Sequence, residues 1–432
     1  MQAAFPRWST SQFANTTTRS TFRTSTKRVW TTDHANGAIH QFRRYRIIRR
    51  RRGLPGWLDR WDWRAERADE GAVDRERGAA LSRASAVALA GRAMMRFTLA
   101  GYGAWGRLHA QTLQRMPEAE LCAVYCHGDA SAAAAAAELP GVTVYRDFRR
   151  MLQEVPGEAV DIVVPNVLHA DFACAALAAD RHVFLEKPLA TTVADCDRVI
   201  AAARSAGRVV AVNHELRVSQ QWGAIRREIA SGAIGRPRYA SFTLFRHAFR
   251  SGSSGWRHDP ARVGSWILEE PVHFFDLLMW YFAAVGEPVA VRARGNGPRA
   301  AEGMYENFSA SMIYPEGEFI TVSQSLGGFE HHCTLEIVGD AGGVRSWWAG
   351  ATARTGTPSF ATRISRRGGE PEALVAPHSG EVFELEEMLR AAIAGFRHNL
   401  APVSAEEARR SIIACLAAEE ACRTGDVIRL LF

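Results

Sequence analysis

The sequence predicts an α/β fold in two parts: an N-terminal, doubly wound parallel sheet of the Rossmann type, and a C-terminal α+β domain with an open, mostly antiparallel sheet. Three observations support this. A glycine-rich turn joins a strand to a helix near residue 101, short apolar runs alternate with helical segments up to residue 216, and long alternating strands follow. We therefore divide the chain into a leading segment (1–93), a first domain (94–216) and a second domain (217–432).

The glycine-rich turn is the first element of that pattern. The apolar strand 97–100 runs directly into Gly101-x-Gly103-x-x-Gly106, and a helix is expected over 108–116. Gly101 permits a tight turn, Gly103 lets the backbone approach a pyrophosphate, and Gly106 lets helix and strand pack closely. The helix N-terminus offers free N–H groups and a positive dipole end to phosphates. We thus predict that a dinucleotide binds along Gly101, Gly103, Ala104, Trp105 and Gly106.

The rest of the first domain alternates strand and helix, which is typical of a parallel sheet. Further strands are expected over 121–125, 142–145, 159–164, 182–185 and 209–212, and helices over 130–139, 147–155, 170–179 and 193–206.

The pattern changes after residue 213. A helix over 219–231 leads to a strand within 232–249, and long alternating strands are expected over 289–294, 307–314, 318–326, 334–338 and 344–349. Such strands indicate an antiparallel sheet with one covered face. Amphipathic helices over 382–397 and 405–423 have apolar faces that predict packing against the protein.

Charge and cysteine content exclude several classes of protein. The net charge of +7 comes from residues 1–93, which carry +11, while the remainder carries −4, so no nucleic-acid partner is expected. The seven cysteines form an odd set without a CxxC pair, which indicates reduced thiols in the cytoplasm and neither disulfides nor a zinc site. No apolar run reaches the ~18 residues of a membrane span, and no metal is predicted.

The leading segment shows no sustained hydrophobic period. We interpret residues 1–93 as a disordered or spurious extension, with translation starting at Met94 or Met95. A transit peptide is an alternative, because residues 1–32 are rich in Arg, Ser and Thr and contain no acid. A functional basic tail is the third possibility.

Several motifs stand in the order found in the Gfo/Idh/MocA oxidoreductases, which the chain resembles from about residue 95 to residue 430. They are the glycine turn, Pro165-Asn166-x-x-His169, Glu186-Lys187-Pro188, Gly255-Trp256-Arg257 and Glu269-x-x-x-His273. The resemblance implies a Rossmann domain followed by an open-faced sheet and NAD(P)-dependent hydride transfer on sugars or polyols. It also implies homodimers or homotetramers formed through that sheet.

Hydride transfer from a secondary alcohol needs a base for the hydroxyl proton and a cation for the developing oxyanion. Lys187 fits the cation: only it and Lys27 are lysines among 53 basic residues. It ends a strand, where such sheets bind ligands, and Pro188 restricts its backbone. Its ammonium can also exchange a proton at neutral pH, unlike guanidinium.

His273 is the candidate base, and Glu269 completes the predicted catalytic set. Pro271 suits the first position of a helix, so His273 would lie in its first turn, where the helix dipole favours neutral imidazole. Glu269, where the family usually has aspartate, is expected to orient the His273 ring or relay its proton. Glu270 is an alternative for that role, and Asp276 is expected to cap or brace the helix.

The resemblance also implies a set of residues around the cofactor. A loop after the fourth strand would line the adenosine and nicotinamide side, Glu186 would contact the cofactor, and a second loop would reach over the nicotinamide or phosphates. Residues after the sixth strand are expected to face the interdomain cleft. These predicted residues are Pro165, Asn166 and His169; Glu186 and Lys187; Trp256 and Arg257; and Asn213, His214 and Arg217.

The choice between NAD and NADP depends on the end of the second strand. An NAD enzyme usually has an acid there, but this chain has Cys126 and His127, with no acid before Asp129. A missing carboxylate removes repulsion of a 2′-phosphate, yet no arginine is evident to bind that phosphate. The sequence therefore favours NADP slightly and leaves NAD open.

Other classes of function stay open. The family contains glycosidases that use NAD for a transient oxidation, and a non-catalytic, dinucleotide-bound regulator is a further alternative. The substrate wall is expected to include Tyr239, Phe245, Arg246, Trp256 and Glu270. His331 and His332 are interpreted as a strand-edge pair and not as a metal site.

Overall fold

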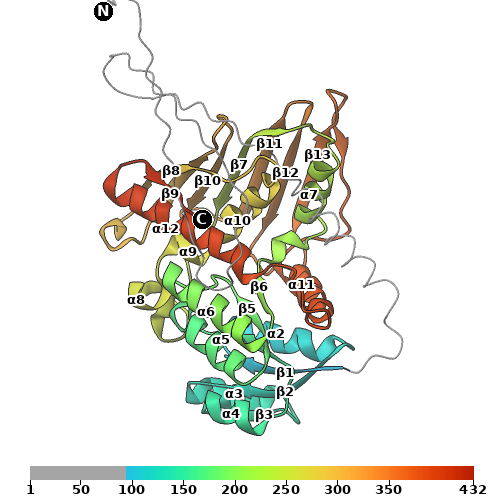
Figure 1. The fold of residues 1–432 in the computed structure, drawn as a ribbon, viewed down its shortest axis with the longest axis vertical. Coiled ribbons are helices and arrows are strands. Elements are labelled where there is room, and N and C mark those ends of the chain that lie inside the picture. Colours follow the sequence, from blue (N-terminus) through green and yellow to red (C-terminus); the bar gives the residue numbers. More distant parts are fainter. Residues whose placement is uncertain (1–93) are drawn as a thin grey trace, which may run out of the picture. The chain divides into compact units, whose positions relative to one another are not determined.

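The computed structural model describes residues 94–432, which form two sheets and the helices that cover them (Figure 1). The interpretation of residues 1–93 as an extension, and its alternatives, lie outside the described residues.

The first sheet is parallel and has six strands in the order β3-β2-β1-β4-β5-β6, so the Rossmann prediction is confirmed. Every residue of β4, β5 and β6 is buried, as expected for strands covered on both faces. The strand order reverses between β1 and β4, and ligands bind beyond the carboxyl ends of strands at such a point. The bounds are β1 (Met95–Ala100), β2 (Ala119–Tyr125), β3 (Thr143–Tyr145), β4 (Ala159–Ile162), β5 (His182–Glu186) and β6 (Val210–Asn213).

The helices of the first domain follow the predicted positions with one clear correction. Helix α2 begins at Ala104, four residues before the expected start, because Gly106 lies inside the helix and not ahead of it. Helix α6 has the predicted bounds, since the Thr192 hydroxyl accepts from Asp195 N–H at its start and Gly207 ends it with φ +61°. The bounds are α2 (Ala104–Arg115), α3 (Asp129–Glu138), α4 (Phe148–Glu154), α5 (His169–Ala178) and α6 (Val193–Ala206).

The second sheet has nine strands in the order β14-β13-β12-β11-β7-β10-β9-β8-β15. Only the pair β7 and β10 is parallel, so the expected mostly antiparallel sheet is confirmed. Strands β13, β14 and β15 were not predicted; β14 and β15 have two residues each and are defined by pairing, without a hydrophobic pattern of their own. The bounds are β7 (Pro237–Phe245), β8 (Ala290–Asn296), β9 (Asn307–Ile313), β10 (Phe319–Ser325), β11 (His331–Gly339), β12 (Gly342–Gly350), β13 (Ser359–Ser365), β14 (Glu372–Ala373) and β15 (Ile428–Arg429).

Helices cover one face of this sheet, in front of it in Figure 1. The contact is aromatic at its centre, where the rings of Phe242 and Phe274 stack with 4.0 Å between centroids. The helices of this region are α7 (Trp222–Ala230), α8 (Pro260–Val263), α9 (Trp266–Glu269), α10 (Val272–Tyr281) and α12 (Ala405–Thr424), with 3₁₀ turns η1 (Asn166–Leu168), η2 (Glu215–Arg217), η3 (Ser253–His258) and η4 (Ala300–Glu302).

Helix α11 (Glu381–Phe396) belongs to the core of the first domain, although it follows the second sheet in sequence. Its buried Leu385 and Leu389 share a cluster with Phe97 and Leu99 of β1. Just beyond it, Val403 accepts a backbone hydrogen bond from Val212 at 3.0 Å and so covers the edge strand β6. The predicted domain boundary at residue 216 therefore lies between the two sheets, but apolar residues from both sides of it pack in the same core.

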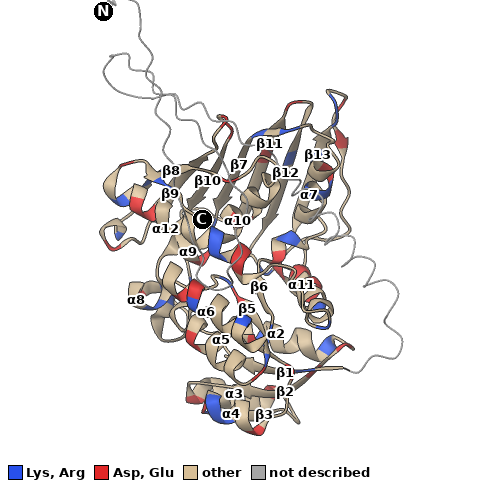
Figure 2. Ribbon diagram, in the orientation of Figure 1, with Lys and Arg blue, Asp and Glu red and all other residues tan. Residues whose placement is uncertain are grey.

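Both signs of charge are interspersed along the helices and at strand ends in the view of Figure 2. All seven cysteines are free thiols. Between residues 94 and 432, no helix is long and apolar enough to cross a bilayer.

Candidate active site

The glycine loop has the geometry of a close strand–helix junction. Gly101 has φ +106°, and a Cβ there would meet the Val163 carbonyl oxygen at 2.1 Å. A Cβ on Gly106 would meet the Gly101 carbonyl oxygen at 2.2 Å, so the helix can approach the strand only with glycine at this position. A Cβ on Gly103 would meet nothing within 4 Å, which leaves open space beside that backbone.

This loop fits a dinucleotide. No side chain caps the N-terminus of α2 at Gly103, so its first N–H groups stay available to an anion. The open side at Gly103 is where a pyrophosphate needs close access to the backbone.

A buried charged cluster lies under the loop and was not foreseen. His109 on α2 has Nδ1 2.9 Å from Asp161 Oδ2 and Nε2 3.0 Å from Glu186 Oε1. Burial opposes a charge on this ring, but the two carboxylates raise the pKa of His109 to about 9. Burial would raise the pKa of Glu186, yet His109, Lys187 and the amide of Asn213, which donates at 2.5 Å, lower it to about 2. Glu186 and Asn213, which were predicted to contact the cofactor, are thus hydrogen-bonded to each other in the interior.

An arginine lies beside the end of β2, and the sequence analysis overlooked it. Arg146 follows β3, which pairs in parallel with β2, so both strands end at the same edge. Its Nη2 donates to the His127 carbonyl oxygen at 2.5 Å, and its Nη1 contacts the Asp129 carboxylate. The expectation that no arginine lies near the end of β2 is wrong, because Arg146 comes from the end of the neighbouring strand β3. Cys126 is fully buried there.

Lys187 follows β5 directly, as predicted, and remains a cation. Its Nζ donates to the Glu269 carbonyl oxygen at 2.5 Å. Burial alone would lower the pKa of Lys187, but nearby carboxylates, first Glu269 and Glu270, raise it above its usual value. His169 supports the segment after it, since its two ring nitrogens lie 2.6 Å and 2.9 Å from the carbonyl oxygens of Pro188 and Val164.

Glu269 has other partners than the predicted His273. Its carboxylate accepts from Arg257 Nε at 2.5 Å and from Asn166 Nδ2 at 3.1 Å. Arg257 also lies over the Trp256 ring, 4.7 Å from its centroid. Asn166, Arg257 and Glu269 therefore form one buried cluster beside Lys187, in which Glu269 holds two elements together and does not orient His273.

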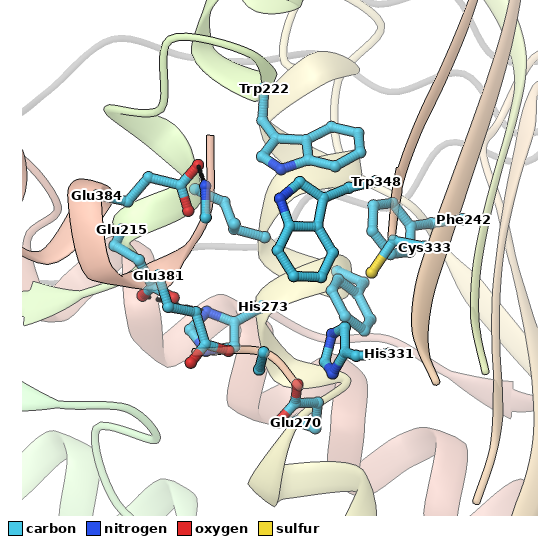
Figure 3. A pocket seen from close by; sticks show the side chains of 14 residues that line it. Glu215, Trp222, Phe242, Glu270, His273, His331, Cys333, Trp348, Glu381 and Glu384 are labelled. Carbon is cyan, nitrogen blue, oxygen red and sulfur yellow. Dashed lines mark hydrogen bonds and ion pairs between the residues drawn. The ribbon is translucent and has the colours of Figure 1, made fainter. Parts of the chain in front are cut away.

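A pocket opens between strands β7, β11 and β12 and the helical segments η2, α7, α10 and α11 (Figure 3). Aromatic side chains and His331 lie on one side of the pocket, while Glu215, Glu381 and Glu384 lie with His273 on the other. The lining residues are Glu215, Leu216, Trp222, Phe242, Glu270, His273, Phe274, His331, Cys333, Trp348, Ala353, Gly380, Glu381 and Glu384.

His273 lines this pocket in the first turn of α10, for which Pro271 is the N-cap. Its Nδ1 lies 3.6 Å from Glu215 Oε2, and its ring packs edge-on against His214. Burial, then Lys187 and His214, hold the pKa of His273 well below its usual value. Neutral imidazole is thus favoured as predicted, and burial and neighbouring positive charge are causes that the sequence did not reveal.

Glu215 is the carboxylate beside His273. Burial and the charges of Glu186 and Glu381 raise the pKa of Glu215 well above its usual value. Both shifts favour the neutral forms of these groups, the protonated carboxyl of Glu215 and the unprotonated imidazole of His273. The imidazole is then free to accept a proton from a ligand.

The remaining carboxylates of the pocket differ in charge. Glu270 forms an ion pair with Arg246 at 2.9 Å. Burial would raise the pKa of Glu270, but Arg246 and Lys187 lower it to about 2. Burial raises the pKa of both Glu381 and Glu384 to about 7, and Glu384 also accepts from Ser219 Oγ at 2.5 Å.

Three other expectations need correction. Arg217 does not face the cleft; it is buried in a bidentate ion pair with Asp276, which braces α10 as predicted. Tyr239 and Phe245 lie on the outer face of β7, opposite the pocket residue Phe242, because side chains alternate along a strand.

The third correction concerns His331, which was interpreted as part of a strand-edge pair. It opens β11, which lies between β7 and β12 and is not an edge strand, and its buried side chain lines the pocket. Within the described part of the chain, no group of three or more His, Cys, Asp or Glu side chains is arranged to hold a metal ion.

Several pocket residues were missed, and some left a signal in the sequence. Glu215 is the second residue after β6, at the sheet edge where ligands bind. Glu384 is an acid on the buried face of an amphipathic helix, beside Leu385. Trp222, Cys333 and Trp348 left no such signal, since apolar side chains at these spacings are expected in any core.

The fold and the site together define a two-domain oxidoreductase with a dinucleotide-binding Rossmann domain. Residues 95–214 match the oxidoreductase family with an NAD-binding Rossmann fold, and residues 222–345 match the GFO/IDH/MocA C-terminal domain. The chain belongs to the GFO/IDH/MocA oxidoreductase family.

Relatives of known name are similar over much of their length. The chain is 30% identical to an inositol 2-dehydrogenase of Acidothermus cellulolyticus over 254 residues, which are 58% of this chain and 72% of that protein. It is 28% identical to that of Rubrobacter xylanophilus over 249 residues, 57% of this chain and 69% of that one. The WlbA dehydrogenase of Bordetella pertussis, solved with NADH and UDP-GlcNAcA, has the same fold, with a TM-score of 0.67 at 22% identity over 79% of this chain and 99% of that chain.

Proposed function

We propose that the protein is an NAD(P)-dependent dehydrogenase or reductase acting on a secondary alcohol or ketone of a cyclic polyol or sugar. The observation that carries the proposal is the pairing of a charged Lys187 with a neutral His273 near one pocket. Lys187 Nζ donates to the Glu269 carbonyl oxygen at 2.5 Å, at the turn between α9 and α10 that leads directly to His273. When bound, the coenzyme supplies the hydride acceptor or donor.

The roles of the two residues follow from their protonation. In the oxidation direction His273 accepts the hydroxyl proton, because burial keeps its ring neutral. Lys187 stabilises the negative charge that develops on the substrate oxygen, because neighbouring carboxylates keep its ammonium charged. A regulator without catalysis would not require this combination.

The pocket suits a polyhydroxylated ring. Glu215, Glu381 and Glu384 offer carboxyl groups that can hydrogen-bond hydroxyls, while Trp222 and Trp348 offer apolar faces for ring C–H groups. Since carboxylates outnumber cations in its lining, sugar phosphates and uronates are expected to be poor substrates. The names of the relatives, inositol 2-dehydrogenases, agree with a cyclitol.

The test is a titration of the full chain with NADH and NADPH, followed by nicotinamide fluorescence, and then a screen of neutral cyclitols and sugars against their acidic derivatives. Saturable binding and coenzyme-linked turnover of a neutral ring are expected. A folded sample that binds neither coenzyme would contradict the proposal. Release of a leaving group without net change in the coenzyme would identify the glycosidase alternative.

Within this proposal, NADP is the favoured coenzyme because of Arg146. The charged partner of the Arg146 guanidinium is Asp129, whose side chain is 97% exposed, and its other contact is the neutral His127 carbonyl oxygen. Arg146 can therefore exchange that carboxylate for a 2′-phosphate.

We expect Arg146→Ala to weaken NADPH binding about 10-fold or more, since a hydrogen bond to a charged group contributes ~1.5–3 kcal/mol. NADH binding should change little. Fluorescence titration with both coenzymes measures the effect, and Arg150→Ala, which removes an exposed arginine of α4 paired with Glu154, is the control. Equal losses for both coenzymes, or none, would show that Arg146 does not select the phosphate.

The outer face of the second sheet is the proposed contact between subunits of a homodimer or homotetramer. Phe245, Phe319 and Val338 expose 49%, 42% and 50% of their surface on neighbouring strands there. Apolar residues gathered on one face are typical of a protein–protein interface. The mass in solution, measured by light scattering, tests this.

A further inference from the structure

An arginine of the second domain lies over the glycine loop of the first. Arg354 belongs to the loop 351–358, which joins β12 to β13. Its guanidinium lies over the Trp105 ring, with 4.7 Å between Cζ and the ring centroid, and its Nη1 donates to the Ala104 carbonyl oxygen at 3.4 Å. Ala104 and Trp105 are the first two residues of α2. Arg354 is therefore located at the helix end that the glycine loop leaves open.

The surroundings of Arg354 are unfavourable for a cation on its own. The N-terminus of α2 is positive, and the contacts of this guanidinium among residues 94–432 are the Trp105 ring and the Ala104 carbonyl oxygen, neither of which is charged. Burial lowers the pKa of Arg354, and the nearby Arg257 and Arg250 lower it further, against an opposing effect of Glu381. Arg354 is exposed and Arg257 is already paired with Glu269, so Arg354 and the positive end of α2 are together available to attract an anion.

We propose that Arg354 binds the diphosphate of the coenzyme from the side opposite the glycine loop, and that the loop 351–358 closes on the coenzyme. This inference rests on the proposed function and adds a binding residue outside the Rossmann domain. A guanidinium can donate two parallel hydrogen bonds to phosphate oxygens, which makes arginine well suited to this position.

The same loop reaches the substrate pocket. Ala353, the residue before Arg354, lines that pocket, and Trp348 lines it from the strand that leads into the loop. Ala353 thus faces the substrate pocket, and the adjacent Arg354 faces the proposed position of the coenzyme diphosphate. If Arg354 is held by the coenzyme, the wall at Ala353 is fixed at the same time, so coenzyme is expected to bind before substrate.

The test compares Arg354→Gln and Arg354→Lys with the wild-type full chain. NADH binding is followed by nicotinamide fluorescence, and ADP-ribose, which has the diphosphate without the nicotinamide, is used as competitor. Arg354→Gln should weaken both ligands about 10- to 100-fold, because it removes a charge-assisted contact. Arg354→Lys should recover part of the loss, and added salt should weaken wild-type binding more than that of Arg354→Gln. Arg345→Gln, which removes an exposed arginine of β12 paired with Glu336, should bind as wild type does.

A second readout follows the loop itself. Hydrogen–deuterium exchange of the amides in 351–358 should slow when NADH binds to the wild type and should not slow in Arg354→Gln. If wild type binds NADH while Arg354→Gln binds it equally well, or the loop is unaffected by NADH, this inference is overturned and the proposed function stands. If wild type binds neither coenzyme nor ADP-ribose, both are overturned.

Discussion

Replacement of Lys187 is expected to abolish turnover while coenzyme binding persists. In Lys187→Met the pocket loses the cation that stabilises the developing oxyanion, and we expect kcat to fall by about 10²–10³-fold or more. NADH binding should stay within a few-fold of wild type, because the glycine loop lies on a separate strand–helix junction. Coenzyme-linked absorbance with the best ring substrate from the screen measures the first effect, and fluorescence titration measures the second.

The conservative variant distinguishes charge from shape. Lys187→Arg keeps a cation, but its planar fork does not reproduce the single donor that reaches the Glu269 carbonyl oxygen at 2.5 Å. We expect only partial recovery of kcat. Substantial activity in Lys187→Met would rule out Lys187 as the stabilising cation.

The second large effect is expected at His273, and it depends on pH. His273→Asn should lower kcat by about 10²–10⁴-fold, the usual contribution of a general base. In the wild type the pKa of His273 is held below 6.5, so its neutral form persists as pH falls to 6.5 and is lost only as pH falls through the lowered value. The acidic limb of the rate profile should therefore lie below pH 6.5.

Two variants test the cause of that limb. In Glu215→Gln the limb should move little, because the raised pKa of Glu215 favours its neutral carboxyl, which the amide of Gln resembles. His332→Asn changes a neighbouring histidine of β11 that the pocket does not include, and it should leave the profile unchanged. An acidic limb at or above pH 6.5 in the wild type would contradict the conclusion that burial, Lys187 and His214 lower the pKa of His273.

Both sheets could be predicted because each depends on a local pattern: a buried run for most of the parallel strands and alternation in most of the second sheet. Strands β14 and β15 could not, since pairing and not burial defines them. The positions of Lys187 and His273 were evident from their motifs. A cationic Lys187 and a neutral His273 were expected as well, but the burial and the neighbouring charges that shift their pKa values were not, because several different segments bring these groups around them.

The errors share a physical origin. Arg146, Glu215 and Arg354 are close to the site only through strand pairing or through a loop returning from the other domain. Glu269 was assigned to His273 from their four-residue spacing. The chain turns at Glu270 between α9 and α10, so that spacing is not that of one continuous helix, and Glu269 meets Arg257 and Asn166 instead.

Helix α11 packs in the first domain but follows the second sheet in sequence, and this order affects how the first domain folds during translation. The ribosome completes β6 at Asn213 but delivers α11 and Val403, which seal the core around β1, almost two hundred residues later. At ~5–20 residues per second this interval is on the order of 10–40 s. Throughout it the nascent Rossmann half exposes the apolar surface that Leu385 and Leu389 later cover, and this surface is the natural binding site for a chaperone during translation.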